Sequence, residues 1–373
     1  MKAIAIVPGT PGAGIVERPE PNIAAPDEIK LRVIRVGICG TDREELSGGR
    51  SEPPEGRKEL VIGHEMFGQV VGVGSAVKMV REGDYAVFTV RRPCGRCAPC
   101  QMDRADMCET GAYRERGIQG LDGYQTEFAV DRERYAIRVS PELESAGVLL
   151  EPLSIVEKAI EETIRLQKVR LPDAAAMPDW PAGRKCLVAG LGPVGLLAAM
   201  VLRLRGCEVF GLDVVDAAGA RPLWLKAIGG NYLDGRQGKA DKIGESSGPM
   251  DLIVDASGIA SVEFNLLDAL AINGAYVLTG IPGGDRPMQI PGAALIRQLV
   301  LKNQLMLGSV NAARGHFQMG AGHLAQARLK WNGLLERLIT QRYTPQEFIG
   351  SKERREPDSI KQVVEWTTPA PRA

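Results

Sequence analysis

The chain has 373 residues, with 46 Lys and Arg against 46 Asp and Glu, so its formal net charge is zero. This balance argues against nucleic acid or an anionic membrane surface as the main partner. No apolar run reaches the ~18 residues that a membrane span needs, and the apolar start is too short for a secretory signal. We therefore expect a cytoplasmic enzyme of two or three domains that acts on a small molecule.

Two residue types stand out in the composition. Glycine occurs 44 times, about 12% of the chain against a usual ~7%, which predicts many tight turns or places where a ligand approaches bare backbone. Cysteine occurs seven times, an odd number, and a reducing compartment would keep the thiols free. The cysteines therefore indicate metal or redox chemistry and not disulfides.

The first half of the chain, to about residue 150, predicts a β-rich domain in the form of a small irregular barrel or sandwich. Its expected strands are residues 29–36, 69–73, 85–90 and 125–130. From Glu151 the apolar residues recur at helical spacing, so a helix is predicted there. We interpret its charged residues from Glu157 to Arg165 as a solvated face. A proline-rich connector at 171–181 is expected to be a surface loop.

Residues 185–307 alternate apolar strands with helical stretches, which predicts a doubly wound parallel sheet. The expected strands are residues 186–189, 208–212, 252–255 and 275–278, and the first expected helix is 194–205. The apolar run at 295–307 is interpreted as core packing, with an edge strand for dimerisation as the alternative. The last ~65 residues, from Ser309, have too little core for a domain of their own, so we expect them to return to the first domain.

A G-x-G-x-x-G motif lies between the first expected strand of this region and the helix that follows it. Gly190 allows the tight turn, Gly192 lets a pyrophosphate approach the backbone, and Gly195 permits close packing of the helix on the sheet. Alone, the motif could be a glycine-rich turn. Asp213 ends the next apolar run, where an acid binds the adenine ribose, so the pair predicts a dinucleotide site. Its carboxylate repels a 2′-phosphate and favours NAD over NADP, a preference that Arg221 softens.

Four cysteines form a cluster with the spacing C-x2-C-x2-C-x7-C: Cys94, Cys97, Cys100 and Cys108. Four thiolates this close together suit a tetrahedral zinc with a closed shell, and an iron–sulfur cluster is the alternative. Because such a zinc has no open position, it would hold the lobe at about residues 92–110 together and do no chemistry.

Two further fragments carry metal-ligand residue types. Cys39 lies on a glycine-flanked turn, and His64, one of only three histidines, follows a glycine and precedes Glu65. Either fragment alone is better explained as an inert thiol or a hydrogen-bonded core histidine. The other two histidines, His316 and His323, are interpreted as surface or packing residues.

Together, the two fragments, the cysteine cluster and the dinucleotide motif resemble the medium-chain, zinc-dependent alcohol dehydrogenase family. Within that family the chain resembles the branch of archaeal-type glucose (aldose) 1-dehydrogenases. The segments that carry this second resemblance are residues 48–49, 54–56, 90–93, 115–118, 151–159 and 308–311.

The resemblance implies an α/β protein of two domains. The first is a GroES-like, β-rich catalytic domain formed by residues 1–155 and 309–373. The second is a Rossmann domain, with a doubly wound parallel sheet, formed by residues 156–308. A homo-oligomer, either a dimer or a tetramer, is expected.

The resemblance also implies the site residues. A catalytic zinc would be bound by Cys39, His64 and either Glu65 or Glu151, the two carboxylates exchanging roles as the site opens and closes. Thr41 is the expected first hydroxyl of a proton relay. The residues expected to hold sugar hydroxyls are Thr41, Glu115, Glu151 and Asn311. The cofactor is assigned to Gly190, Leu191, Gly192, Pro193, Val194, Gly195, Asp213, Thr279, Gly280, Ile281 and Ser309.

The implied reaction is oxidation of an aldose such as glucose at C1 to the lactone, with NAD preferred and NADP as the second option. Zinc would lower the pKa of the C1 hydroxyl. One alternative is a zinc-dependent polyol, secondary-alcohol or threonine-type dehydrogenase. Another, from a different class, is a non-catalytic redox sensor that binds zinc and dinucleotide. Cys186 and Cys207 are left as ordinary buried thiols.

Overall fold

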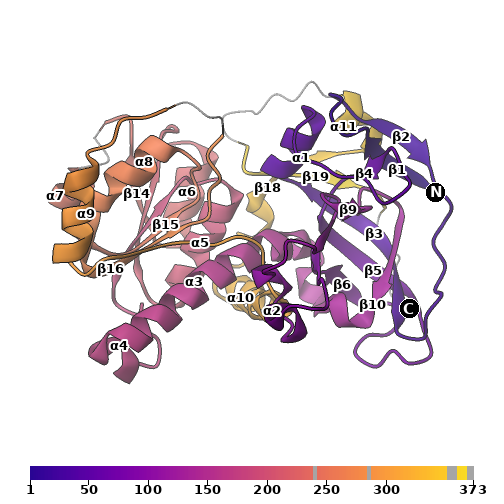
Figure 1. The fold of residues 1–373 in the computed structure, drawn as a ribbon, viewed down its shortest axis with the longest axis horizontal. Coiled ribbons are helices and arrows are strands. Elements are labelled where there is room, and N and C mark those ends of the chain that lie inside the picture. Colours follow the sequence, from indigo (N-terminus) through magenta and orange to yellow (C-terminus); the bar gives the residue numbers. More distant parts are fainter. Residues whose placement is uncertain (238–241, 284–286, 351–358, 368–373) are drawn as a thin grey trace. The chain divides into compact units, whose positions relative to one another are not determined.

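The computed structural model describes residues 1–237, 242–283, 287–350 and 359–367 (Figure 1). The chain divides into two compact units. The first unit consists of residues 1–154, 311–329 and 335–373, and the second of residues 155–310 and 330–334. The first is built on mainly antiparallel sheets and the second on a parallel sheet, so the predicted α/β fold class is confirmed.

The largest sheet of the first unit joins strands from both ends of the chain. In spatial order it contains β11 (Ala136–Val139), β6 (Tyr85–Phe88), β5 (Glu65–Val73), β3 (Glu28–Ile38), β19 (Lys361–Glu365) and β18 (Ile339–Tyr343), with β10 (Phe128–Arg132) also paired to β3. In this register Gly37 of β3 lies opposite Glu65 of β5 on one side and Val363 of β19 on the other. The C-terminal strand is thereby brought to the end of β3, immediately before Cys39.

Two smaller sheets and four helices complete the first unit in the described part of the chain. One sheet contains β2 (Gly14–Glu17), β1 (Lys2–Ile6) and β4 (Leu60–Val61), and the other β7 (Arg91–Arg92), β8 (Arg114–Arg116) and β9 (Gly120–Leu121). The α-helices are α1 (Gly40–Leu46), α2 (Ala98–Gln101), α10 (Arg314–Lys330) and α11 (Pro345–Gly350). The last residue of α10, Lys330, is assigned to the second unit. The long helix α3 (Leu150–Arg170) begins in the first unit and continues into the second.

The second unit contains a parallel sheet of six strands within the described residues. Their spatial order is β14 (Asn231–Asp234), β13 (Glu208–Asp213), β12 (Lys185–Ala189), β15 (Met250–Asp255), β16 (Leu270–Leu278) and β17 (Leu305–Gly308). The order reverses between β12 and β15, and such a switch point is where doubly wound sheets bind ligands at the carboxyl ends of their strands. The connecting helices are α5 (Pro193–Leu204), α6 (Ala220–Ala227), α7 (Ile243–Ser247), α8 (Ala260–Asn265) and α9 (Gly292–Leu301).

The charged stretch of α3 is not the solvated face that its sequence suggests. Glu157 is 0% exposed and Lys158 is 1% exposed. Lys158 Nζ donates a hydrogen bond to the carbonyl oxygen of Val310 at 2.8 Å, which lets an ammonium group be buried. Only Arg165, at the C-terminal end of the stretch, is exposed as expected, and it forms an ion pair with the half-buried Glu161.

Two other expectations were also wrong. The proline-rich connector contains a short helix, α4 (Pro172–Ala176), whose proline occupies the first turn, where its missing N–H costs nothing. The apolar run at 295–307 forms the end of α9 and the edge strand β17, and it is only partly core. Ile296, Val300 and Leu301 are 65–74% exposed. Among the described residues, no helix combines the length and the apolar character that crossing a membrane requires.

Candidate active site and zinc lobe

Cys39, His64 and Glu65 meet where β3 ends and β5 begins. Cys39 caps the N-terminus of α1, where its sulfur accepts a hydrogen bond from the N–H of Thr41 at 3.2 Å. Its own N–H donates to Asp42 Oδ2 at 2.7 Å, which fixes the turn. Cys39 Sγ lies 3.2 Å from His64 Nε2, and one ligand atom from each of the three residues lies within 4.8 Å of the others.

The electrostatics of this cluster favour a cation. Burial lowers the pKa of His64, but the charges of Cys39 and Asp42 outweigh burial and hold that pKa well above its ordinary value. His64 Nδ1 faces Asp42 Oδ1 at 3.9 Å, which is too long for a hydrogen bond, and neither atom has a hydrogen-bond partner among the described residues. Burial raises the pKa of Glu151 to about 7, against the opposing charge of His64. Glu151 thus belongs to the same buried cluster, although it lies outside the group of three.

The donor set fits a catalytic zinc. Sulfur, imidazole nitrogen and carboxylate oxygen are the ligands that zinc takes in proteins, and catalytic sites keep three of them plus an open position. Gly63, with φ of +90°, makes the turn that presents His64. A side chain there would also lie 2.6 Å from Gln125 Cγ, so glycine is required on both counts.

Lys361 is a site residue that sequence analysis did not find. It is 1% exposed, its Nζ donates to the carbonyl oxygen of Ile38 at 3.0 Å, and it forms an ion pair with Glu65 Oε2. The pair fills the space beside Gly37, where a Cβ would lie 2.0 Å from Glu65 Oε2 and 2.7 Å from Lys361 Cε. A lysine at the start of the short strand β19 gives no sequence signal of a site residue, and its partner is known only from the folded sheet.

Glu115 and Asn311, the expected sugar ligands, are hydrogen bonded to each other. Asn311 Nδ2 donates to Glu115 Oε1 at 2.8 Å. Arg91, which sequence analysis did not single out as a site residue, donates to the same oxygen from Nε at 3.0 Å and from Nη2 at 2.8 Å. No described residue donates a hydrogen bond to Glu115 Oε2, so that oxygen is available as an acceptor. Asn311 Oδ1 in turn accepts a hydrogen bond from the N–H of Ala312 at 2.8 Å.

Glu45 is a buried carboxylic acid of α1, the helix that Cys39 caps. It is 0% exposed, and neither carboxyl oxygen has a hydrogen-bond partner among the described residues. Burial and then the charge of Asp42 raise its pKa from 4.5 to about 9. The folded chain thus holds a proton that the unfolded chain releases above about pH 4.5, so the stability falls as the pH rises towards 9.

The variant Glu45→Gln should remove this loss. Its gain in unfolding free energy over the parent chain should be small at pH 5 and reach at least about 1 kcal/mol at pH 8, measured by urea unfolding. Glu44→Gln, a change at the exposed neighbouring residue, serves as the control and should show no such dependence. An equal gain for Glu45→Gln at both pH values would contradict the assignment.

The four cysteines of the zinc lobe converge as their spacing predicts. Cys94 Sγ and Cys97 Sγ lie 3.5 Å apart, and Cys97 Sγ and Cys108 Sγ lie 3.9 Å apart. Cys100 completes the group. A tetrahedron with Zn–S bonds of ~2.3 Å has edges of about 3.8 Å, so the sulfur positions fit zinc. Hydrogen bonds, first from the Thr110 hydroxyl, lower the pKa of Cys94 to about 5, which favours the thiolate form that metals bind.

The predicted dinucleotide residues lie at the carboxyl ends of the parallel strands in the second unit. Gly192 is the N-cap of α5, and a Cβ on Gly195 would lie 1.8 Å from the carbonyl oxygen of Gly190. Asp213 Oδ2 accepts from the N–H of Leu191 at 2.8 Å and from Arg221 Nη1 at 3.4 Å. The motif and the acid are therefore in contact, as the dinucleotide hypothesis requires.

The remaining assigned cofactor residues follow β16 and β17. Thr279 Oγ1 donates to the carbonyl oxygen of Asp255 at 2.6 Å, and the N–H of Gly280 donates to the same oxygen at 3.1 Å. Ile281 is 72% exposed. Ser309 is buried, and its hydroxyl has no hydrogen-bond partner among the described residues. The hydroxyl is therefore available to form a hydrogen bond with a ligand.

The residues that sequence analysis set aside lie outside both metal-ligand groups. Cys186 and Cys207 are 0% exposed. His316 is buried, and its Nδ1 accepts a hydrogen bond from the N–H of Ala313 at 2.9 Å. His323 lies half-buried on α10.

The fold and the site define a zinc-type alcohol dehydrogenase with a GroES-like domain. The family model described as the alcohol dehydrogenase GroES-like domain matches residues 25–141. The model described as the glucose dehydrogenase C-terminus matches residues 144–366, more than half of the chain. The chain therefore belongs to the glucose dehydrogenase family, and the resemblance drawn from its sequence is confirmed.

Individual relatives agree with the family models. The chain is 37% identical over 346 residues to a glucose 1-dehydrogenase of Methanocella arvoryzae, covering 92% of this chain and 93% of the relative. It is 39% identical to glucose 1-dehydrogenase 2 of Vulcanisaeta moutnovskia, covering 92% of each. A glucose dehydrogenase structure from Haloferax mediterranei, in complex with NADP, Zn and gluconolactone, superposes with a TM-score of 0.87 at 32% identity, covering 99% of this chain and all of the other.

Proposed function

We propose that this chain is a glucose (aldose) 1-dehydrogenase that oxidises the C1 hydroxyl of the sugar to the lactone with NAD or NADP as the acceptor. The observation that carries the proposal is that the first unit contains both of two groups of residues. One is the Cys39–His64–Glu65 ligand cluster. The other is the hydrogen-bonded pair Glu115–Asn311. The names of the relatives, and the lactone and NADP bound by the Haloferax enzyme, support the same substrate and cofactor class.

The chain's own residues would divide the work between binding and proton transfer. A zinc held by Cys39, His64 and Glu65 would supply Lewis acidity that makes the C1 hydroxyl more acidic. Thr41, two residues from Cys39, is proposed as the first hydroxyl of a proton relay, which accepts that proton while it donates its own to the next group. Glu151, whose pKa lies at about 7, can hold or release a proton near neutral pH and is proposed to exchange with Glu65 as ligand.

The sugar hydroxyls are assigned to Glu115, Glu151 and Asn311. Arg91 and Asn311 hold Glu115 Oε1, so Oε2 is oriented to accept from a hydroxyl. A site built of such fixed polar groups rejects substrates that lack the matching hydroxyl, because the buried groups are then left without partners.

The variant Glu115→Gln tests this assignment. Loss of a charge-assisted hydrogen bond, about 1.5–3 kcal/mol, should raise the KM for glucose at least tenfold. The matched control is Glu109→Gln, at an exposed position of the zinc lobe, which should leave KM unchanged. An unaltered KM in Glu115→Gln would remove the residue from the sugar site.

The reaction itself is tested by a panel of aldoses and alditols with NAD and with NADP, before and after zinc chelation. We expect aldose-dependent reduction of the cofactor that chelation abolishes. We also expect NAD to be the better acceptor, because the carboxylate of Asp213 would repel a 2′-phosphate. Arg221, whose Nη1 lies 3.4 Å from Asp213 Oδ2, softens this preference. Activity on alditols or amino alcohols alone would favour a polyol or threonine-type dehydrogenase. No activity on any alcohol would favour a redox sensor.

A homo-oligomer is proposed on separate grounds. β17 ends the parallel sheet in the described part of the chain, and the neighbouring helix α9 exposes Ile296, Val300 and Leu301. An open edge with apolar neighbours is suited to pairing with a second copy. Sedimentation velocity should show a dimer or tetramer that Val300→Glu weakens at least tenfold, whereas Val169→Glu, at an 89% exposed position of α3, should not. A monomeric parent chain would contradict the proposal.

A further inference from the structure

Glu115, the proposed sugar ligand, lies on β8, which pairs with β7 to form a short antiparallel ribbon. Arg91 of β7 is directly opposite Glu115, and the residues that follow these two are Arg92 and Arg116. Neighbouring residues of a strand point to opposite faces. Arg91 and Glu115 therefore share one face, called here the front of the ribbon, and the two following arginines point to its back.

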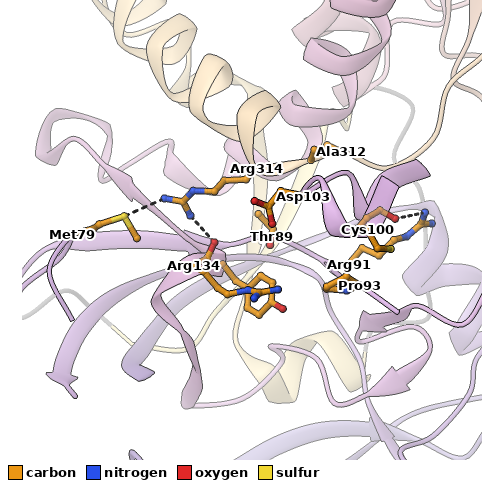
Figure 2. A pocket seen from close by; sticks show the side chains of 12 residues that line it. Met79, Thr89, Arg91, Pro93, Cys100, Asp103, Arg134, Ala312 and Arg314 are labelled. Atoms are coloured by element: carbon orange, nitrogen blue, oxygen red, sulfur yellow. Dashed lines mark hydrogen bonds between the residues drawn. The ribbon is translucent and has the colours of Figure 1, made fainter. Parts of the chain in front are cut away.

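The front of the ribbon borders open space. Arg91 lines a cavity of about 390 Å³ together with Thr89 and Pro93, which belong to the segments on either side of β7 (Figure 2). On this face Glu115 is held by hydrogen bonds from Arg91 and Asn311. Because a cavity supplies no atoms to pack against, the ribbon needs support from its back to keep Glu115 in one orientation.

The back of the ribbon is held by one carboxylate, that of Asp131 in β10. Its Oδ2 accepts hydrogen bonds from Arg92 Nε and Nη2, at 3.2 and 2.6 Å, and from Arg116 Nε and Nη2, at 3.1 and 2.6 Å. Its Oδ1 accepts from the N–H of Arg132 at 2.8 Å, which fixes the carboxylate itself. β10 pairs with β3, so Asp131 attaches both strands of the ribbon to the sheet that also positions Cys39.

The electrostatics of this contact make it a strong one. Asp131 is 8% exposed and Arg92 is 5% exposed. Burial raises the pKa of Asp131, but the charges of Arg116 and Arg92 outweigh burial and hold that pKa below its ordinary value. Hydrogen bonds between charged groups are stronger than those between neutral groups. Removing the carboxylate would leave two like charges close together without the counter-charge that both of them contact.

We propose that Asp131 is a positioning residue for the sugar. Through Arg92 and Arg116 it holds the β7–β8 ribbon in the orientation that turns Glu115 towards the substrate, without touching the substrate itself. The inference rests on the proposed function, because it takes Glu115 to be a sugar ligand. A change at the back of the ribbon should therefore be felt at the front as a loss of sugar affinity, whereas cofactor and zinc binding should not change.

The test separates sugar affinity from the other properties of the zinc-loaded enzyme. Asp131→Asn should raise the KM for glucose at least tenfold, as expected for the loss of charge-assisted hydrogen bonds, and should change kcat less than threefold. The dissociation constant of NADH, from fluorescence titration, and the zinc content should match those of the parent chain. The matched control is Glu133→Gln, at a buried carboxylate that accepts backbone N–H groups. It should lower the thermal stability and leave the KM unchanged.

A double variant shows whether Asp131 acts through Glu115. If it does, Asp131→Asn should raise the KM less than threefold when Glu115 is already glutamine, because residues that act through one another are not additive. Full additivity, or a loss of zinc and of NADH affinity together with the rise in KM, would show a merely structural role and overturn the inference. Arg116→Gln, at a half-buried residue, should raise the KM at least threefold and carries the same comparison if Asp131→Asn does not fold.

The inference and the proposed function fail in different ways. A parent chain that oxidises glucose, with an unchanged KM in Asp131→Asn or in Arg116→Gln, would overturn the inference alone. A parent chain that oxidises no aldose would overturn the proposed function and this inference with it.

Discussion

Replacing Cys39 with alanine is expected to lower kcat/KM for glucose by about a thousandfold or more. The change removes the sulfur that lies 3.2 Å from His64 Nε2 and leaves too few ligands to hold a metal against water. Loss of metal-ion catalysis costs several kcal/mol of transition-state stabilisation, and about 4 kcal/mol corresponds to three orders of magnitude in rate.

Zinc content separates this effect from misfolding. The parent chain should carry two zinc ions and Cys39→Ala one, because the four-cysteine lobe is untouched. Cys186→Ala, which alters a buried thiol outside both groups, should keep both ions and most of the activity. Wild-type activity in Cys39→Ala would contradict the ligand assignment.

The second large effect is expected for Lys361→Met. This change leaves the carboxylate of Glu65, 2% exposed, in the interior without its ammonium partner. Breaking a buried pair by removing one partner typically costs 3–5 kcal/mol. In the zinc-free protein the thermal midpoint should therefore fall by about 10 °C, as measured by calorimetry. The loss should be smaller in the zinc-loaded protein if Glu65 is a ligand, because the metal then supplies the missing positive charge.

Two controls make this result specific. The double variant Lys361→Met/Glu65→Gln should recover most of the stability, since no charge is left buried. Lys30→Met breaks the surface pair with Glu20, which is half exposed, and should cost no more than about 1 kcal/mol. If Lys361→Met were no more harmful than Lys30→Met, the buried pair would have no structural role.

The parts of the site that sequence analysis could predict are those encoded by contiguous residues. The turn at Gly190 and the spacing of Cys94, Cys97, Cys100 and Cys108 act through local backbone geometry, so the motif by itself specifies which side chains or N–H groups converge. The α/β class was predictable for the same reason, because strand and helix periodicity is a local property.

Groups brought together by distant segments were not predictable in this way. The contact of Lys361 with Glu65 depends on β19 pairing with β3, and that register is set by the packing of the whole sheet. The contact of Arg91 with Glu115 depends likewise on the pairing of β7 with β8. Lys158 has the sequence context of a surface residue and is buried because Val310 offers it a carbonyl oxygen.

The sequence by itself determined the chemistry that this protein carries: its metal-ligand types, its dinucleotide motif and its family. Only the tertiary structure decided which charges are buried and which of them are paired. The physical reason is that ligand type and turn geometry are properties of a few neighbouring residues. Burial and electrostatic pairing are properties of the space between segments that only the folded chain brings together.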